Sequence, residues 1–278
     1  MPVQSLPSAS NQAAPLQVNR LITVDDFSGR WPVAAVGNDW SRAYYDGAFH
    51  LFPPPDGGPA ISLVFVQSRD GNTCAANPSD LGGGPTDKHL IYEGLSRVAA
   101  DGVLAGASTV GKSVFFTVKH PQMVALRRDL GLPRHPAQIV LSERGHLDWS
   151  SRLFSTPDVP VFILAGDECV RRVSMEVQRR PWITMIPIAG DLRAAVTRLR
   201  TDHGLTRISA VGARVAATTL VDAGLVQDLY LTTSAFAGGE PGTPWYVGEH
   251  KPAMQVVVRK IEDTLDHPIL FEHVALLR

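Results

Sequence analysis

Two glycine-containing turns in this chain have the composition of phosphate-binding loops. Residues 106–113 read GASTVGKS, which matches the G-x-x-x-x-G-K-S pattern and follows a short apolar segment. Such a loop holds nucleotide phosphates when it joins a buried strand to a helix, because backbone N–H groups and the helix dipole then point at the phosphates. Residues 113–118 are rich in β-branched and aromatic side chains, and Pro121 interrupts them, which disfavours that helix. A P-loop protein that binds ATP or GTP is therefore less favoured, and it stays open as an alternative.

The second turn comprises Val211, Gly212, Ala213 and Arg214, at the start of an expected helix that ends at Gly224. Small residues here let the phosphates of a ligand approach the backbone, and the guanidinium of Arg214 offers a bidentate contact. The alternative is that the small residues only permit close packing of strand and helix. No G-x-G-x-x-G motif occurs, so a Rossmann dehydrogenase with that motif is disfavoured.

Strands alternate with helices along most of the chain. Short apolar segments rich in β-formers predict strands at 61–66, 102–105, 138–141, 161–164, 183–186 and 208–211. Helical spacing predicts helices at 87–99, 191–203 and 213–221, whereas the chain ends in strands at 229–233, 254–261 and 269–277. We therefore expect an α/β fold, with a mostly parallel central sheet, helices on both faces and antiparallel C-terminal edge strands.

Three segments differ in composition. Residues 1–18 are predicted to be a disordered tail, because they carry little apolar surface. Residues 19–59 are expected to form an irregular, aromatic-rich segment packed on the body, and prolines and glycines at 53–59 mark its end. The α/β domain then occupies residues 60–278.

The overall composition excludes several classes of protein. The 26 Lys and Arg residues nearly balance the 27 Asp and Glu residues, which disfavours a nucleic-acid partner or an anionic membrane surface. No apolar run is long enough to span a bilayer, and residues 1–15 do not resemble a secretory signal. Only two cysteines are present and the nine histidines lack metal-ligand spacing, so we expect a cytoplasmic protein without a metal.

In their order, these segments resemble the RibD C-terminal domain family, the pyrimidine reductases of riboflavin synthesis, which have a dihydrofolate-reductase-like fold. The resemblance covers about 61–278. It is carried by a Ser-x-Asp-Gly turn after the first strand, at 68–71, and by Arg97 four residues before Asp101. A Gly-x-x-Thr-Val loop follows at 106–110, and residues 211–213 are the counterpart of a Glu-Gly-Gly turn. A Leu-x-x-Ala-Gly-Leu-Val phrase occupies 220–226.

The resemblance implies an NADPH-dependent reductase that forms a homodimer and has a small heterocyclic substrate. It places the nicotinamide near 68–71, which makes Ser68 and Asp70 the catalytic candidates. Asp70 could equally hold this turn by bonding to the backbone. The resemblance further implies cofactor contacts from both glycine turns and from the end of the strand at 138–141: Gly106, Ala107, Ser108, Thr109, Val110, Ser142, Val211, Gly212, Ala213 and Arg214.

Two positions depart from the family pattern. Val211 stands where the family has an acidic residue, and Gly111-Lys112-Ser113 stands where it tends to have an Asp. Loss of polar groups built for one substrate costs orders of magnitude in discrimination. We therefore expect a diverged substrate, pyrimidine- or pterin-like or another small C=N or C=O compound. The alternative is a nucleotide-binding protein of the same fold with little or no catalysis.

Overall fold

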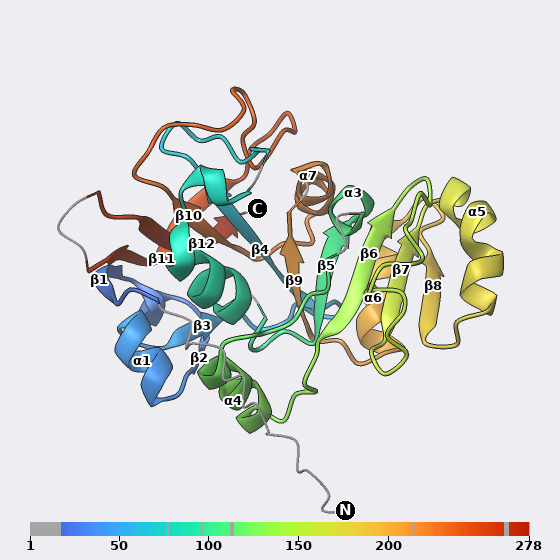
Figure 1. Cartoon of the computed structure of the whole chain (residues 1–278), viewed down its shortest axis with the longest axis horizontal. Coiled ribbons are helices and arrows are strands. Elements are labelled where there is room, and N and C mark those ends of the chain that lie inside the picture. The colour runs from blue at the N-terminus through green and yellow to red at the C-terminus, as the bar shows by residue number, and fades with distance from the viewer. Residues whose placement is uncertain are drawn as a thin grey trace, which may run out of the picture.

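A ten-stranded sheet forms the centre of the protein, and its strand order is β1-β11-β12-β10-β4-β9-β5-β6-β7-β8 (Figure 1). The computed structural model describes residues 18–277 except 77, 96, 112–113, 213 and 264–266. The strands of this sheet are β1 (Leu21–Asp26), β4 (Ala60–Gln67), β5 (Gly102–Gly106), β6 (Ala137–Ser142), β7 (Val161–Ala165), β8 (Ile183–Pro187), β9 (Arg207–Val211), β10 (Asp228–Thr233), β11 (Ala253–Glu262) and β12 (Leu270–Leu277).

The strands from β10 to β8 in this order run parallel, while β12, β11 and β1 continue the sheet in antiparallel pairs. All strands predicted from residue 61 onward are present within about two residues of the expected bounds. The α/β fold with antiparallel C-terminal edge strands is confirmed. The parallel strands place their carboxyl ends along one edge of the sheet, where the two glycine turns follow β5 and β9.

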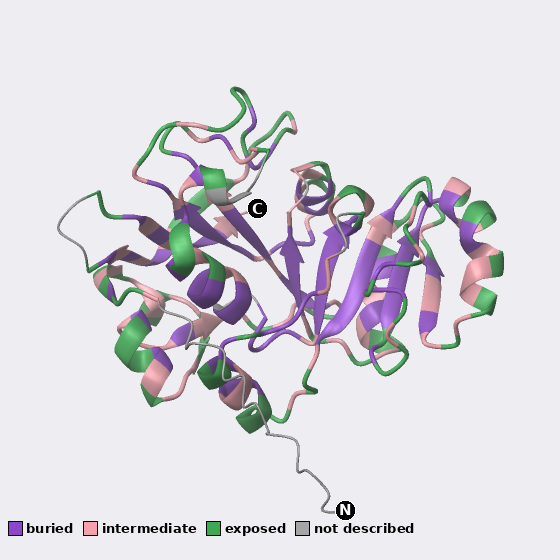
Figure 2. Ribbon diagram, in the orientation of Figure 1, coloured by how far each residue is buried: buried purple, intermediate pink, exposed green. Residues whose placement is uncertain are grey.

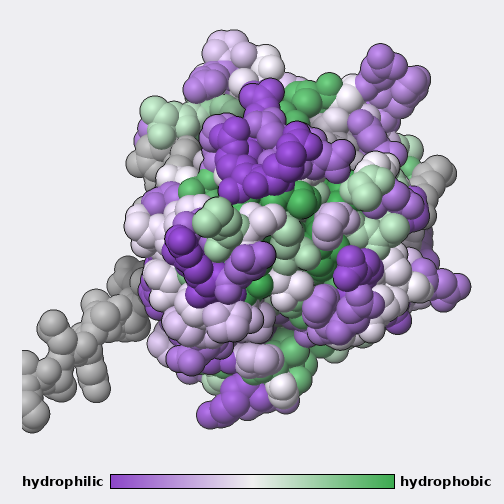
Figure 3. Space-filling view, turned by 90° about the vertical axis from the view of Figure 1, so that its right-hand side faces the viewer, coloured by the Kyte–Doolittle hydropathy of each residue, from purple (hydrophilic) through white to green (hydrophobic). Residues whose placement is uncertain are grey.

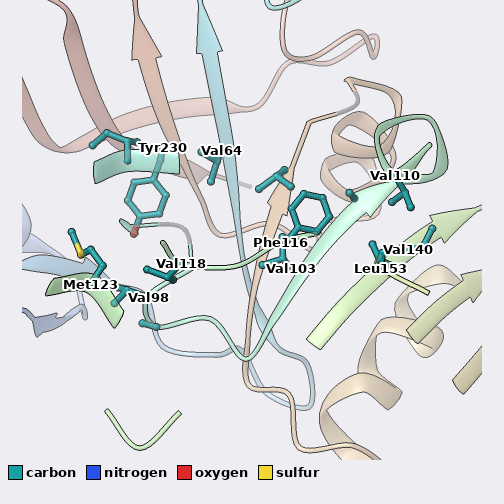
Figure 4. Packing of buried hydrophobic residues seen from close by; sticks show 14 of the residues in the cluster. Val64, Val98, Val103, Val110, Phe116, Val118, Met123, Val140, Leu153 and Tyr230 are labelled. Carbon is teal, nitrogen blue, oxygen red and sulfur yellow. The ribbon is translucent and has the colours of Figure 1, made fainter. Parts of the chain in front are cut away.

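The parallel strands are mostly buried (Figure 2), and apolar side chains cover both of their faces. Helices α6 (Leu192–Thr201) and α7 (Arg214–Asp222) pack on one face, and α4 (Pro121–Asp129), α5 (Asp167–Gln178) and the π-helix η3 (Asp87–Leu95) contribute to the cluster on the other. In this second cluster Phe116, Val103 and Val110 gather beside β5 (Figure 4). Both faces of the parallel strands are therefore covered by packed side chains.

Residues 19–59 were expected to be irregular, and this expectation is wrong in part. They form β1, the short helix α1 (Asp39–Tyr45), the 3₁₀ turn η1 (Ser28–Arg30) and the two-stranded sheet of β2 (Ala34–Val36) and β3 (Phe49–Leu51). Strand β1 exists because it pairs with β11 near the other end of the chain, and such a partner leaves no local pattern in the sequence. Residues 1–17 of the expected tail lie outside the described residues.

The helices differ from the sequence prediction in three places. The helix expected at 87–99 ends at Leu95 and has π geometry, and it follows two single turns, η2 (Pro78–Leu81) and α2 (Gly84–Thr86). The sequence analysis did not identify α4 or α5. Helix α5 presents the charged side chains of Glu168, Arg171 and Arg172 outward, and hydrophilic groups gather on this end of the molecule (Figure 3). Among the described residues, no helix has the length and hydrophobicity needed to span a bilayer.

Arg127 of α4 holds the connection that leads into β5. Its side chain is only 1% exposed, and it donates hydrogen bonds to the carbonyl oxygens of Arg97 (2.8 Å), Ala100 (2.6 Å) and Pro133 (2.6 Å). Burial lowers the pKa of Arg127 to about 10, so the guanidinium is still charged at neutral pH. These bonds join α4 to the segment before β5 and to the loop after α4.

Replacing Arg127 by Met should lower the free energy of unfolding by about 3 kcal/mol, because the carbonyl groups of Arg97, Ala100 and Pro133 lose a charged donor. The matched control is Arg128→Met, since the neighbouring Arg128 side chain is 78% exposed and bonds only to Asp129. Urea denaturation of both variants measures the difference. Equal losses in the two variants would contradict the anchoring role of Arg127.

Candidate functional site

The two glycine turns meet at the carboxyl edge of the sheet, because β5 and β9 are neighbouring parallel strands. Gly212 has a left-handed backbone with φ of +64°, and a Cβ atom placed on it would lie 3.2 Å from Oγ1 of Thr109. Figure 1 shows α7 and the single-turn helix α3 (Ala107–Val110) next to each other at this edge. The structure therefore brings the two predicted phosphate-binding turns together at one edge of the sheet.

The first turn does not continue into a long helix. Gly106 is the N-cap of α3 without a side-chain cap, and α3 ends after one turn. Residues 114–119 then cross the sheet without regular secondary structure, and Phe116 pairs through its backbone with the side-chain amide of Gln138. A P-loop requires a helix at this point, so the arrangement disfavours that alternative. Lys112 and Ser113 lie outside the described residues.

The predicted cofactor residues differ in how far their side chains can reach a ligand. Ser108 is exposed, while Ala107, Thr109, Gly212 and Arg214 are partly buried at the edge of the sheet. The side chains of Val110, Ser142 and Val211 are buried, so they offer a ligand at most their backbone. The hydroxyl of Ser142 accepts the N–H of Gly145 at 3.0 Å and thereby shapes the turn after β6. Ala213 lies outside the described residues.

The turn after β4 holds both predicted catalytic residues. The hydroxyl of Ser68 donates to Oδ1 of Asp70 at 2.6 Å, and the N–H of Gly238 donates to the same oxygen at 3.1 Å. These two bonds, that from Ser68 first, keep the pKa of Asp70 below its ordinary value. A carboxylate that stays ionised does not donate a proton near neutral pH. The contacts of Asp70 therefore favour the interpretation that it holds the turn.

A long loop after β10 is tied to this turn. Asn72 donates through its side-chain amide to the carbonyl of Gly238 at 2.9 Å, and the backbone of Thr73 donates to the carbonyl of Thr243 at 2.8 Å. The N–H of Glu240 in turn donates to the carbonyl of Cys74 at 2.8 Å. Residues 68–74 and 236–243 thus form one unit at the ends of β4 and β10, beside the two glycine turns.

Asp87 is a further acidic residue of this edge, and the sequence analysis used it only to mark the start of a helix. The hydroxyl of Thr232, in β10, donates to Oδ1 of Asp87 at 2.5 Å. Burial raises the pKa of Asp87 to about 6 against the effect of this hydrogen bond, and the nearby charge of Glu262 adds to the rise. A half-buried carboxyl group with a raised pKa at the carboxyl edge of a parallel sheet is typical of a functional site.

The described residues contain no group of three or more His, Cys, Asp or Glu side chains that could hold a metal ion. Among the described residues, this edge offers backbone N–H groups, the cations of Arg214 and Arg144, and the carboxyl groups of Asp70 and Asp87. Such a set fits a ligand with phosphates and a polar ring.

Residues 59–265 match the family model described as the RibD C-terminal domain. The chain belongs to this family. The pyrimidine reductase-like protein of Corynebacterium diphtheriae has a TM-score of 0.63 at 20% identity, over 79% of this chain and 92% of that one. RibD of Acinetobacter baumannii, form 2, has a TM-score of 0.62 at 15% identity, over 79% of this chain and 58% of that one.

Riboflavin Biosynthesis Reductase Rib7 of Saccharomyces cerevisiae is a more distant likeness, with a TM-score of 0.54 at 14% identity over 80% of this chain and 92% of that one. The chain therefore spans nearly all of two of these relatives but little more than half of RibD. At these identities the structural likeness establishes the dihydrofolate-reductase-like fold. No curated protein sequence matches the chain.

Within the RibD C-terminal domain fold, Val211 occupies the end of β9, where the sequence resemblance predicted an acidic residue. Its side chain is 1% exposed and belongs to the same apolar cluster as Val110 and Phe116. A carboxylate would be costly in this environment. The buried end of β9 therefore suits the apolar side chain of Val211 and not the acidic one that the resemblance predicted.

Gly212→Ala should lower the free energy of unfolding by about 2 kcal/mol, from the left-handed backbone and from the contact of the new methyl group with Thr109. Gly204→Ala is the matched control, because Gly204 has φ of +72° but open space around it. Its loss should be about 1 kcal/mol. When Thr109→Ala is added to Gly212→Ala, denaturant titrations should show that part of the lost free energy of unfolding returns. Additive effects of the two substitutions would contradict a contact between these positions.

Proposed function

We propose that this chain is an NADPH-dependent reductase of the riboflavin-pathway pyrimidine reductase type. Its substrate is a pyrimidine- or pterin-like ring compound, or another small C=N or C=O compound. This substrate differs from the one that the family reduces. The observation that carries the proposal is the closeness of Gly212 and Thr109, because it supports a shared phosphate site formed by two turns that are about 100 residues apart in sequence. Membership of the RibD C-terminal domain family supports the same reaction class.

The residues present fit a dinucleotide. Any side chain at Gly212 would press on Thr109, so the backbone there is kept bare, and Gly106 caps α3 without a side chain. The pyrophosphate would lie over the 106–109 turn and over Gly212, with Arg214 supplying positive charge. Arg144, exposed after β6, is the cation that would meet a 2′-phosphate, because Ser142 is already engaged by Gly145.

When bound, reduced nicotinamide supplies a hydride. The chain's share of the reaction is to orient the reactants and to exclude water. The tied loops at 68–74 and 236–243 border the site and keep Asp70 in one position, which limits the directions from which a substrate can approach. We further propose a cytoplasmic homodimer, and the free thiols of Cys74 and Cys169 agree with a reducing compartment.

A nucleotide-binding protein without catalysis is the second candidate. The observation that favours it is the apolar environment of Val211, which removes one expected substrate contact from the site. This candidate predicts binding of the cofactor but no oxidation of NADPH with any ring compound.

Calorimetric titration with NADPH, NADH and Mg·ATP should show binding of NADPH and none of Mg·ATP. Gly212→Ala should weaken NADPH binding about tenfold, since a methyl group enters the space over which the pyrophosphate lies. Gly204→Ala should leave the Kd unchanged, because Gly204 has the same left-handed backbone but lies before β9, at the amino ends of the parallel strands. Binding of Mg·ATP alone would refute the reductase and support the P-loop alternative.

A further inference from the structure

A cavity of about 680 Å³ lies at the beginning of β10. It is surrounded by the end of α7, by the segment 246–252 that leads into β11, and by the last residues of β12. Leu276 lines the cavity, and its N–H donates to the carbonyl of Gln227, directly before β10 begins. The loops at 68–74 and 236–243 follow the opposite ends of β4 and β10, so the cavity is separate from the candidate reductase site. A volume of this size is typical of sites for small organic ligands.

The lining of the cavity has an acidic part and an apolar part. Its ionisable side chains are the carboxyl groups of Asp222 and Glu249 and the imidazole of His250. Among the described residues, neither carboxyl group forms an ion pair, and no Lys or Arg lines the cavity. The apolar lining residues are Val221, Val226, Val247, Pro252, Leu276 and Leu277. A ligand that suits both parts carries a positive charge next to an apolar body.

The acidic part also has fewer hydrogen-bond donors than acceptors. The hydroxyl oxygen of Tyr246 lies 2.7 Å from Oδ1 of Asp222 and 2.9 Å from the carbonyl oxygen of His250. A hydroxyl group has one proton, so it donates to only one of these oxygens at a time. Tyr246 is 6% exposed, and its hydrogen bond to Asp222 raises its pKa, so the phenol keeps its proton at neutral pH. The other oxygen of the pair is left to accept a hydrogen bond from a ligand.

The backbone beside Tyr246 is bare. A Cβ atom placed on Gly248 would collide with the hydroxyl oxygen of Tyr246 and would lie 3.1 Å from Oδ1 of Asp222. Glycine at 248 therefore keeps the space next to these two polar atoms open. The segment is also held in place, because the N–H of Val247 donates to Oγ1 of Thr218 in α7 at 3.0 Å. The acidic part of the cavity is therefore preformed.

Two cations occur near this part of the cavity, and both contact other groups. Arg193 of α6 donates to the carbonyl of Ala223, directly after α7 ends. The ammonium group of Lys251 lies 5.7 Å from the centroid of the Trp245 ring. Neither forms an ion pair with a lining carboxyl group, so the negative charge of the cavity is available to a ligand.

We propose that this cavity binds a small amphipathic amine, with its ammonium group between Asp222 and the carbonyl of His250 and its apolar body against Val226 and Leu276. The ammonium group donates to the carboxylate and to the oxygen that Tyr246 leaves without a donor. Binding here does not depend on the proposed reductase activity. Helix α7 separates the two sites, since it begins at the second glycine turn and its last residue, Asp222, lines the cavity. Its nine residues span about 13 Å.

The probe is 2-phenylethylamine, and 2-phenylethanol is its neutral match with the same ring. Nitrogen-15 NMR titrations of the whole chain should show saturable shifts of the Gly248 and Leu277 amide signals with the amine. The alcohol should bind about tenfold more weakly, because it lacks the charge. The signal of Gly131, after α4 on the other face of the sheet, should not move. Equal affinities for the amine and the alcohol would overturn the proposal.

Asp222→Asn removes the charge with little change of shape at an exposed position. It should weaken binding of the amine about tenfold and leave the affinity for the alcohol unchanged. Asp202→Asn is the matched control, because Asp202 is also exposed at the end of a helix but pairs with Arg198. Gly248→Ala should weaken both probes, since its methyl group enters the space next to Tyr246. An unchanged Kd for the amine in Asp222→Asn refutes the proposed site.

Two other occupants of the cavity would give different results. Arg278 follows Leu277 in the chain and lies outside the described residues. Binding of the amine to Arg278→Gln but not to the wild type would make this arginine the occupant and refute the proposal. Sedimentation of the wild type and of Asp222→Asn should give the same mass. A lower mass for Asp222→Asn would assign the cavity to a contact between two copies of the chain and refute the proposal as well.

Titration with both ligands keeps the amine site apart from the proposed function. The amine should leave the Kd for NADPH within about twofold, and NADPH should leave the Kd for the amine within about twofold. Competition between them would place the amine in the reductase site and overturn a separate cavity site. Failure of the chain to bind NADPH would refute the proposed function alone, because the amine titration uses no cofactor.

Discussion

The parallel pairing of β4, β9 and β5 is the constraint on which the candidate site depends. Parallel strands in one sheet must present their carboxyl ends together, so the turns after these strands lie side by side whatever their sequence. What the sequence adds is the choice of residues at those turns. Glycine at 212 admits the left-handed backbone and leaves room for Thr109, so the two glycine turns can lie close together. The antiparallel strands β12, β11 and β1 extend the sheet beyond β10 and bring Glu262 toward the same edge.

The sequence was sufficient for the parallel part of the fold and for the glycine turns. Each of these leaves a local pattern: a short apolar segment for the strand, and small residues where the backbone must stay bare. Strand β1 leaves no such pattern, because it is held by β11 and because apolar and polar residues do not alternate in its sequence, LITVDD. The single-turn length of α3 also depends on tertiary contacts, since Gln138 of β6 binds the backbone of Phe116 and keeps the following segment extended.

The roles of the acidic side chains could not be predicted for the same reason. Asp70 stood in a motif that the resemblance placed near the nicotinamide, but its properties follow from Ser68 and from Gly238, which comes from a distant loop. Asp87 stood in no motif. Its hydrogen-bond donor, Thr232, is 145 positions away, and Glu262 is on another strand. A charge pattern in sequence carries no information on burial, and burial is the largest cause of the raised pKa at Asp87.

The end of β9 carries the apolar side chain of Val211 where the resemblance to the family predicted an acidic one. The strand register aligns Val211 of β9 with Val64 of β4 and Tyr230 of β10, and Thr232 lies two residues farther along β10 on the same face. An acidic residue at 211 would project into the space that Val110 and Phe116 now help to fill. Asp87, from the helix that follows β4, places a carboxyl group beside Thr232 of β10. A compound that binds an acidic residue at position 211 would meet only apolar side chains at the end of β9. This is a physical reason to expect the same hydride chemistry on a different ring compound.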